Sequence, residues 1–480
     1  MHFPPTFSRF GVALVILLSA ATGGAQPDLL AGARPIAAAP PDPAVARALQ
    51  AIQPADIEQT IKALVGFGTR NTLSSMETDL PPGQGINAAA DWVAAQFERI
   101  AQQCGGCLEV HRDTFTEPAA GRIPQPTTIT NIYAILRGAD PSEAKRMVLV
   151  TGHYDSRITN VMDARGAAPG ANDDASGVAV SLECARALSK LHLPSTVVFV
   201  AVAGEEQGLN GSSHLAKLAH SEGWQLEAVL NNDIVGGNTT PGDTLQLKDR
   251  VRVFSEGVPT AATPEQARRM RALGQENDSP SRELARAIAD TARTYFPAAS
   301  GTAFAPVLVF RPDRYLRGGD HTSFNREGFA AVRFTEWRED FNHQHQNIVI
   351  PEAGSKDPIL GDLIQFVDFN YVANVARLNA ATLATLALSP GEPANVTIVT
   401  KNLDNGTTLH WDPPAGAGAG IHNELLWRET SAPDWQFSQT VAPQTDGGQA
   451  TVTVPISKDN VIFAVRAVDA SGHRGLPVVP

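Results

Sequence analysis

Several segments of this chain are apolar at nearly every position and alternate with amphipathic helical patterns. The clearest is STVVFVAVAGEE at 195–206, where charged residues occur only at the last two positions. A strand of this kind has to be covered on both faces, and strands that alternate with helices usually pair in parallel. The sequence therefore predicts an α/β fold with a mainly parallel, mixed sheet and helices on both faces.

The alternation extends along most of the chain, and we expect one large domain over residues 55–390. Strands are predicted within 146–156, 195–206, 226–236 and 329–336, and helices within 174–191, 212–223 and 281–296. Residues 237–275 interrupt this rhythm. We expect them to be an insertion whose structure the pattern leaves undefined.

The composition changes near the C-terminal end. Residues 392–480 contain about seven short alternating segments separated by turn signals, which predicts a small all-β sandwich. They also resemble a fibronectin type III domain, through Trp411 followed by Pro413 and Pro414, and through FAVRAVDASG at 463–472. The resemblance implies an adhesion or spacing module, whose partner would be a surface or a polymer.

Residues 1–25 have the features of a secretory signal peptide. A cationic start at Arg9 is followed by an apolar run at 12–18 and by small residues suited to cleavage. The run is too short to span a bilayer, so we expect a secreted or periplasmic protein without stable membrane insertion after cleavage. An uncleaved membrane anchor is the alternative. Residues 26–54 are expected to form a linker and the start of the mature chain.

The cysteines agree with export. Cys104 and Cys107 lie close together in QCGGC, and in an oxidising compartment this spacing predicts a disulfide. A redox or zinc-binding CxxC is the alternative, although a second cysteine pair is missing. Cys184 lies in a helical pattern and is expected to be a buried packing residue.

The charge of the chain argues against one class of partner. The formal net charge is −12, and Lys and Arg form no cluster of the kind that binds a phosphate backbone. We therefore expect no nucleic-acid partner. The hydrophobic content of 43% is sufficient for a large packed core.

Acidic and imidazole side chains gather where the predicted strands end. These are His153 and Asp155, Glu205 and Glu206, Asp233, the later His343 and His345, and the adjacent pair Asp173 and Asp174 in APGANDDASG. The carboxyl ends of parallel strands face one crevice, so we expect these groups to converge. So many acids would repel one another unless divalent cations neutralise them. Mixed His and carboxylate ligands favour zinc, with cobalt or manganese as substitutes.

In their order, these motifs resemble the two-zinc exopeptidases, which include bacterial leucine-type aminopeptidases, glutamate carboxypeptidase and, more distantly, glutaminyl cyclase. The resemblance covers about residues 60–385 and implies a metallopeptidase domain with two Zn²⁺ ions. It also implies a ligand set. His153 would bind one zinc, Asp173 would bridge both, and Glu206 and Asp233 would each bind one metal.

A late histidine completes the second zinc site in this family. The family usually has Y-H-T with an acid a few residues on, whereas this chain has FNHQHQN. His343 has Asn347 in the place of that acid, and His345 keeps a comparable reach beyond Phe341. The sequence leaves the choice between the two histidines open.

Two further carboxylates are expected to act in catalysis. Glu205 matches the family residue that stays off the metal, which implies a general base that takes a proton from metal-bound water and passes it to the leaving amine. Asp155 lies two residues beyond His153, on the same side of an extended chain. It can therefore accept the second imidazole N–H of that ligand and fix its tautomer.

Three more residues are expected beside the ligands or the substrate. The resemblance implies a cis peptide bond between Asp173 and Asp174, so that Asp174 lies next to the bridging ligand. It also implies that Asp320 and His321, in RGGDHTSFNREGF, lie near the active site. A structural turn is the alternative for these last two.

The reaction implied by the resemblance is hydrolysis of peptides from the N-terminus, with an apolar or broad residue preference. A carboxypeptidase is the alternative, and Arg311, Arg314 and Arg317 are its candidates for holding a terminal carboxylate. A glutaminyl cyclase is less favoured, because that branch works with one zinc. A secreted binding protein without activity would have lost a ligand or the base, yet Glu205 is present.

Overall fold

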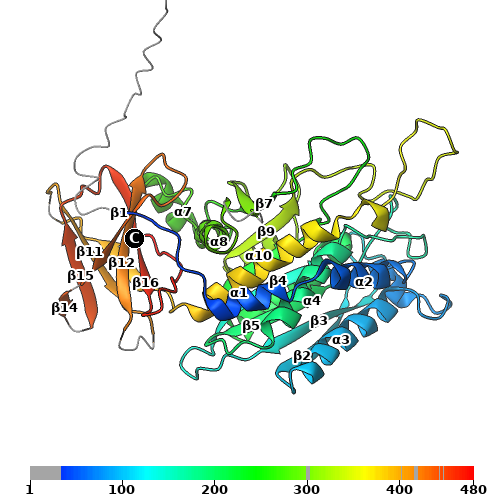
Figure 1. Ribbon diagram of the computed structural model, residues 1–480, viewed down its shortest axis with the longest axis horizontal. Helices are drawn as coiled ribbons and strands as arrows, with labels where there is room; N and C mark the ends of the chain where they lie inside the picture. Colours follow the sequence, from blue (N-terminus) through cyan, green and yellow to red (C-terminus); the bar gives the residue numbers. More distant parts are fainter. Residues whose placement is uncertain (1–33, 299–302, 402, 416–419, 443, 447) are drawn as a thin grey trace, which may run out of the picture.

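The computed structural model describes residues 34–298, 303–401, 403–415, 420–442, 444–446 and 448–480. The predicted signal peptide at 1–25 lies outside this part of the chain. Figure 1 shows a large α/β part and, at the left, a smaller part made of β-strands. None of the helices in the described ranges combines the length and the apolar character that crossing a membrane requires.

An eight-stranded mixed sheet forms the centre of the large part, in the order β2-β3-β5-β4-β6-β9-β7-β8. The strands are β2 (Leu108–Glu117), β3 (Thr127–Leu136), β4 (Arg146–His153), β5 (Thr196–Val202), β6 (Gln225–Asn232), β7 (Arg250–Ser255), β8 (Ala305–Val309) and β9 (Ala331–Glu336). β4 pairs in parallel with β5 and β6, β6 with β9, and β7 with β8. The other three pairings are antiparallel. The predicted mixed α/β fold is therefore confirmed.

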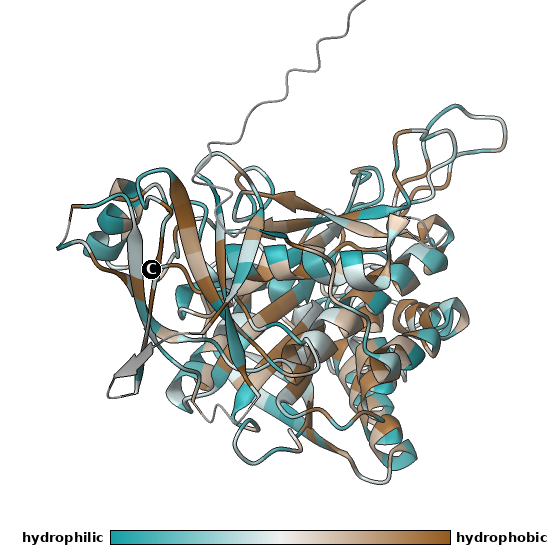
Figure 2. Cartoon of the chain, turned by 60° about the vertical axis from the view of Figure 1, so that its left-hand side comes forward, coloured by the Kyte–Doolittle hydropathy of each residue, from teal (hydrophilic) through white to brown (hydrophobic). Residues whose placement is uncertain are grey.

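Helices cover both faces of this sheet. On one face lie α1 (Pro43–Gln50), α2 (Pro54–Val65), α3 (Ile86–Gln103), α4 (Ala175–Leu188), α8 (Pro280–Tyr295) and α10 (Phe369–Leu388). On the other lie α6 (Asn210–Ser221) and α9 (His321–Arg326). β5 shows why its sequence is continuously apolar. Val197, Phe199 and Ala201 enter the first core, and Val198, Val200 and Val202 enter the second. Figure 2 shows the apolar residues concentrated on the inner strands and on the helix faces that pack against them.

The segment 237–275 is more ordered than its pattern suggested. It contains β7 and the helix α7 (Pro264–Ala272), and β7 is a full member of the sheet between β9 and β8. Arg250 and Arg252 of β7 are half-buried, whereas Val251 and Val253 are buried. Because β7 lies near the edge of the sheet, it does not carry the continuous apolar pattern of the inner strands.

The C-terminal part consists of two four-stranded antiparallel sheets, in the orders β1-β13-β12-β16 and β10-β11-β15-β14. Their strands are β1 (Arg34–Pro35), β10 (Ala394–Ile398), β11 (Thr407–Asp412), β12 (His422–Glu429), β13 (Phe437–Val441), β14 (Gln444–Asp446), β15 (Gln449–Val454) and β16 (Val461–Val468). Trp411 and Trp427 are buried in a common core. The all-β architecture agrees with the prediction, while the fibronectin type III resemblance stays a prediction.

The N-terminal segment connects the two parts. β1 pairs with β13 of the C-terminal part, and Val45 and Leu49 of α1 are buried in the core of the large part. The residues expected to be a linker therefore add a strand to the C-terminal part and a helix to the core of the large part. The domain boundaries proposed from the sequence stay predictions.

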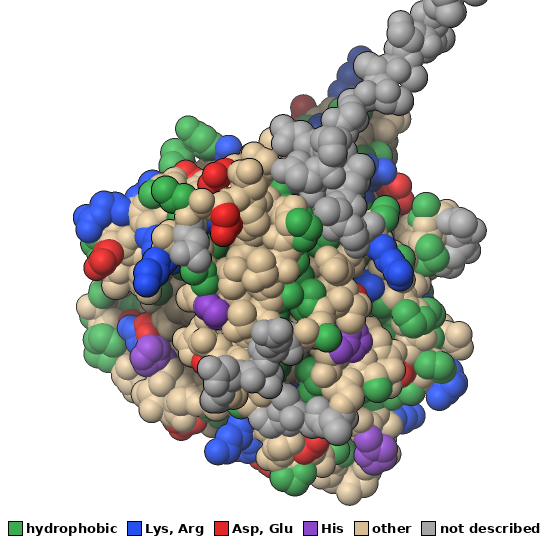
Figure 3. All heavy atoms as spheres, turned by 90° about the vertical axis from the view of Figure 1, so that its left-hand side faces the viewer, with side chains coloured by type: hydrophobic (Ala, Val, Ile, Leu, Met, Phe, Trp, Pro, Cys, Tyr) green, Lys and Arg blue, Asp and Glu red, His purple; other side chains and the backbone are tan. Residues whose placement is uncertain are grey.

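Buried charges join the C-terminal part to α8. Both carboxylate oxygens of Asp278 accept hydrogen bonds from Arg428, at 2.6 and 2.9 Å, and Arg286 of α8 donates to the same carboxylate at 2.9 Å. The indole N–H of Trp435 donates to Glu283 at 2.7 Å. On the face shown in Figure 3, Lys and Arg side chains are scattered among acidic ones.

The cysteines are placed as the sequence predicted. Cys104 and Cys107 form a disulfide directly after α3. Cys184 is a buried free cysteine in α4.

Candidate metal centre

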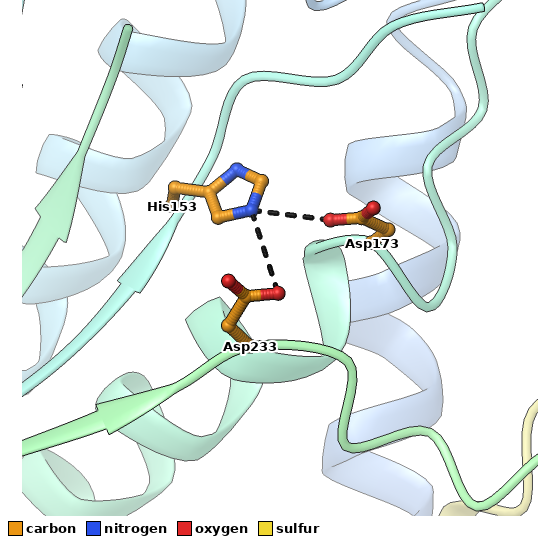
Figure 4. Close-up of side chains that lie close together, drawn as sticks. All are labelled: His153, Asp173 and Asp233. Atoms are coloured by element: carbon orange, nitrogen blue, oxygen red, sulfur yellow. Dashed lines mark ion pairs between the residues drawn. The ribbon is translucent and has the colours of Figure 1, made fainter. Parts of the chain in front are cut away.

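The carboxyl ends of three strands bring the predicted ligands together. His153 is the last residue of β4, and Asp233 directly follows β6. Glu205 and Glu206 open α5 (Glu205–Gly208), the short helix after β5. Asp173 comes from a different direction, because it stands two residues before α4. Figure 4 shows His153, Asp173 and Asp233 facing one another.

One group of side chains, which we call the first cluster, consists of His153, Asp173 and Asp233. His153 Nε2 lies 3.1 Å from Asp173 Oδ1 and 4.0 Å from Asp233 Oδ1. All three residues are buried, and one ligand atom of each lies within 4.8 Å of the others. This is a donor set of one imidazole and two carboxylates, which suits zinc.

The second cluster consists of Asp173, Glu206 and His345. His345 Nε2 lies 2.8 Å from Asp173 Oδ2 and 3.1 Å from Glu206 Oε1. Within the described part of the chain, Glu206 Oε1 is buried and receives no hydrogen bond of ordinary geometry. Asp173 thus offers one oxygen to each cluster, and a cation in the second cluster would satisfy the orphaned oxygen of Glu206.

The structure distinguishes between the two late histidines. The backbone of His345 has a φ of 57°, and its imidazole belongs to the second cluster. The ring of His343 instead stacks on Phe366, with the ring centroids 3.6 Å apart, and its Nδ1 lies 3.9 Å from Asp340. His343 joins neither cluster, so the geometry favours His345 as the ligand.

Asp155 lies on the outer side of His153. Its Oδ1 is 3.3 Å from His153 Nδ1, and its own carbonyl oxygen is 3.1 Å from the same nitrogen. Its Oδ2 accepts hydrogen bonds from Thr72 Oγ1 at 2.9 Å and from the backbone N–H of Glu206 at 3.2 Å. Asp155 therefore orients one ligand through the imidazole and a second through the backbone.

Asp174 supports the first cluster through the backbone. Its Oδ2 accepts a hydrogen bond from the His153 N–H at 2.9 Å, and its Oδ1 accepts one from the Gly177 N–H at 2.9 Å at the start of α4. The Asp173–Asp174 peptide bond is cis, as the resemblance implied. Asp174 therefore holds the backbone of the ligand His153, whereas the carboxylate of Asp173 lies in the clusters.

Glu205 belongs to neither cluster, although it lines the cavity beside them. Burial raises the pKa of its carboxyl well above the usual range, and the neighbouring Glu206 and Asp233 add to the rise, while His153 opposes it. A carboxylate with a raised pKa takes up a proton readily. This is the property that a general base needs near neutral pH.

Asp320 and His321 are both fully buried at the start of α9. Burial raises the pKa of Asp320 to about 7, and the nearby His153 opposes this rise. His321 Nε2 lies 2.8 Å from the carbonyl oxygen of Pro312 and 3.7 Å from Asp313. The charge of His153 in the first cluster therefore acts on Asp320. His321 instead holds the loop before α9 through its contact with Pro312.

Two arginines that the sequence analysis did not single out contact the clusters. Arg333 lies in β9 and reaches Asp233 Oδ1 at 2.7 Å. Arg157 Nε lies 3.1 Å from Glu206 Oε2, and its Nη2 lies 2.6 Å from His345 Nδ1. The signal for Arg333 was a single cation inside the apolar strand FAAVRFTE. Arg157 had no comparable signal.

Arg70 holds the loops that carry the ligands. It is fully buried and donates hydrogen bonds to four backbone carbonyls, those of Leu64, Tyr154, Pro169 and Gly170, at 2.6 to 2.9 Å. Tyr154 stands between His153 and Asp155, and Pro169 and Gly170 belong to the loop that leads to Asp173. The guanidinium therefore fixes both approaches to the first cluster.

Asp362 supports Asp173 from behind. Its carboxylate accepts hydrogen bonds from the backbone N–H of Asp173 at 2.7 Å and of Asn172 at 2.9 Å. Burial raises the pKa of Asp362 to about 7. Nearly 190 residues separate these partners along the chain, so no local pattern could have indicated the contact.

The clusters open on a cavity of about 660 Å³. Besides the acids of the site, four arginines line it, namely Arg122, Arg157, Arg314 and Arg317. Arg311 is not among the lining residues, and its guanidinium lies over the ring of Tyr315, 5.3 Å from the centroid. A ligand in this cavity would therefore contact both acidic side chains and arginines.

Known proteins are similar to this chain over most of its length. The sequence profile of Peptidase family M28 matches residues 131–350. A probable zinc metalloprotease of Pyricularia oryzae is 45% identical over 453 residues, which cover 93% of this chain and 86% of that protein. One of Leptosphaeria maculans is 43% identical over 441 residues, which cover 92% and 97%. Among solved structures, LapB from Legionella pneumophila aligns with a TM-score of 0.49 and 20% identity, over 75% of this chain and 80% of that one. Because the identity with the first two proteins extends over nearly the whole chain, this chain belongs to peptidase family M28 and is a zinc metallopeptidase.

Proposed function

We propose that this metallopeptidase is an aminopeptidase that uses two zinc ions to remove N-terminal residues from peptides. The observation that carries the proposal is the position of Asp173, which gives Oδ1 to the first cluster and Oδ2 to the second. Two cations held in this way would be neighbours that share one carboxylate. That is the arrangement of two-metal hydrolytic sites.

The residues present fit two zinc ions. His153, Asp173 and Asp233 would hold one ion, and Asp173, Glu206 and His345 the other. Each set combines imidazole and carboxylate donors, and the orphaned oxygen of Glu206 lacks the partner that a cation would supply. When bound, such ions polarise the scissile carbonyl and lower the pKa of a bound water to about 7.

Side chains of the protein carry out the proton transfers. Glu205 takes the proton of the attacking water and returns it to the leaving amine. Its raised pKa suits both steps, because the carboxylate must accept a proton and then release it. Asp155 keeps the Nδ1 proton of His153 in place, so that Nε2 stays free to act as a ligand.

A carboxypeptidase is the second candidate, and the cavity gives a specific reason for it. Arg317 lines the cavity, and its side chain is 33% exposed, 3.3 Å from Glu339 and 3.4 Å from Gln344. Arg314 is more tightly held, by Glu339 at 2.8 Å and Asp313 at 3.1 Å. Arg317 is therefore the better placed of the two to bind a terminal carboxylate of a peptide.

One experiment separates these functions. The purified full chain is incubated with aminoacyl nitroanilides and with N-blocked peptides, each with and without a chelator. Chelator-sensitive release from free amino termini alone supports the aminopeptidase. Release from blocked peptides alone, lost in Arg317→Gln and kept in the control Arg311→Gln, supports the carboxypeptidase and refutes the first proposal.

We further propose that the protein acts outside the cytoplasm after removal of residues 1–25. The Cys104–Cys107 disulfide supports this proposal, because such bonds persist in oxidising compartments. N-terminal sequencing of the exported protein tests it. A mature chain that starts near residue 26 is the expected result, and a chain retained with residue 1 in the cytoplasm refutes it.

A further inference from the structure

The two clusters differ in what lies behind their histidines. Behind His153, Nδ1 faces two acceptors, the carboxylate of Asp155 at 3.3 Å and its carbonyl oxygen at 3.1 Å. An imidazole that gives Nε2 to a cation has its proton on Nδ1, where these acceptors would receive it. The first cluster therefore provides the partners that a metal-bound ring needs.

Behind His345 the situation is reversed. Nδ1 lies 2.6 Å from Nη2 of Arg157, and a guanidinium has N–H donors but no acceptor. A ring that gives Nε2 to a cation has its proton on Nδ1, and this proton would face the N–H of the guanidinium instead of an acceptor. Nε2 is the atom that faces Asp173 and Glu206, at 2.8 and 3.1 Å. A cation in the second cluster needs that same atom without its proton.

The charge of Arg157 acts in the same direction. Its Nε lies 3.1 Å from Glu206 Oε2, so the guanidinium already neutralises part of one ligand and would repel an incoming dication. Arg333 also contacts a ligand, Asp233, but it is fully buried and shares its charge with Asp313 at 3.3 Å. Arg157 lines the open cavity, which gives its side chain room to move away.

We propose that Arg157 is a positioning residue that makes the two zinc sites unequal. It holds Glu206 and His345 in their metal-free arrangement, so the second cluster binds zinc more weakly than the first and fills only when Arg157 leaves His345. The inference rests on the two-zinc centre proposed above. It makes the peptidase dependent on the local concentration of free zinc, with the second site as the limiting one.

The test is a zinc titration of the full chain after a chelator has removed its metal. Calorimetry measures the heat of binding, and the bound metal is measured after equilibration. The wild type should bind two ions in two separate steps. Arg157→Met should tighten the second step by about tenfold or more, because a cation beside a dication is removed, and should leave the first step unchanged. Arg317→Met is the matched control. It removes a cavity arginine that contacts neither cluster, and both steps should stay within about twofold of the wild type.

Arg157→Lys keeps the positive charge but loses the planar contact with Nδ1, and it covers the case in which the methionine variant does not fold. Its second step should lie between the wild type and Arg157→Met. An unchanged second step in either folded variant overturns the role of Arg157 and leaves the two-zinc centre intact. A single bound ion at saturating zinc, in the wild type and the variants alike, overturns the two-zinc centre itself.

Discussion

Arg70 provides the sharpest test of how the ligand loops are held. Replacing it with Met removes a charged group from a fully buried position. The carbonyls of Tyr154 and Pro169 then lose their donor, whereas those of Leu64 and Gly170 keep a backbone N–H. A buried acceptor that loses its partner costs about 1 to 3 kcal/mol. Relief from burying a guanidinium offsets part of the sum for these two acceptors, so we expect the lower end, about 2 kcal/mol. Domains of this kind are stable by only about 5 to 15 kcal/mol.

The assay is urea unfolding of the zinc-free protein, so that metal binding does not contribute. Arg70→Met should lose about 2 kcal/mol of unfolding free energy, and Arg70→Lys less, because its ammonium group keeps some of the donors. The control is Arg165→Met. Arg165 is 49% exposed and pairs with Glu77 and Asp79 at the surface, so its loss should cost less than about 1 kcal/mol. If Arg70→Met lost no more than this control, the four carbonyl contacts would not be what holds the loops.

Three further predictions follow from the site and the core. Glu205→Gln should lower kcat by about 10² to 10⁴-fold without changing bound zinc, measured by hydrolysis rates and metal content, and normal turnover would exclude Glu205 as the base. Burial raises the pKa of Glu336 to about 8 from 4.5, so the stability that its protonated form contributes is present at low pH and is lost as pH rises through 8. Glu336→Gln should therefore weaken the fall in urea midpoint between pH 6 and 9, and an unaltered profile would contradict this. Arg428→Met should cost about 3 kcal/mol in urea unfolding, because it leaves Asp278 short of a partner, and a cost below 1 kcal/mol would show that Arg286 suffices.

Much of the fold could be predicted because the sheet leaves a strong local pattern. β5 and β6 are apolar on both faces, and the segments that follow them carry Glu205, Glu206 and Asp233. The rule that carboxyl ends of parallel strands share an edge was then sufficient to bring these residues together. The family expected from these motifs is confirmed by the comparisons.

The parts that could not be predicted depend on contacts between distant segments. Arg157 and His345 are 188 residues apart, and Asp362 and Asp173 are 189 apart, so neither pair forms a local pattern. The choice between His343 and His345 depends on the backbone. His345 has a left-handed φ, and its imidazole lies in the site. The sequence FNHQHQN does not specify which of its two histidines adopts this backbone conformation.

The pairing of β1 with β13 has a consequence for how the protein is made. Arg34 lies opposite Ser438, about 400 residues further along the chain, so a ribosome releases one partner long before it produces the other. β1 can therefore pair with β13 only when synthesis is almost complete. A chain interrupted before β13 would contain every proposed ligand, yet β1 would have no strand to pair with.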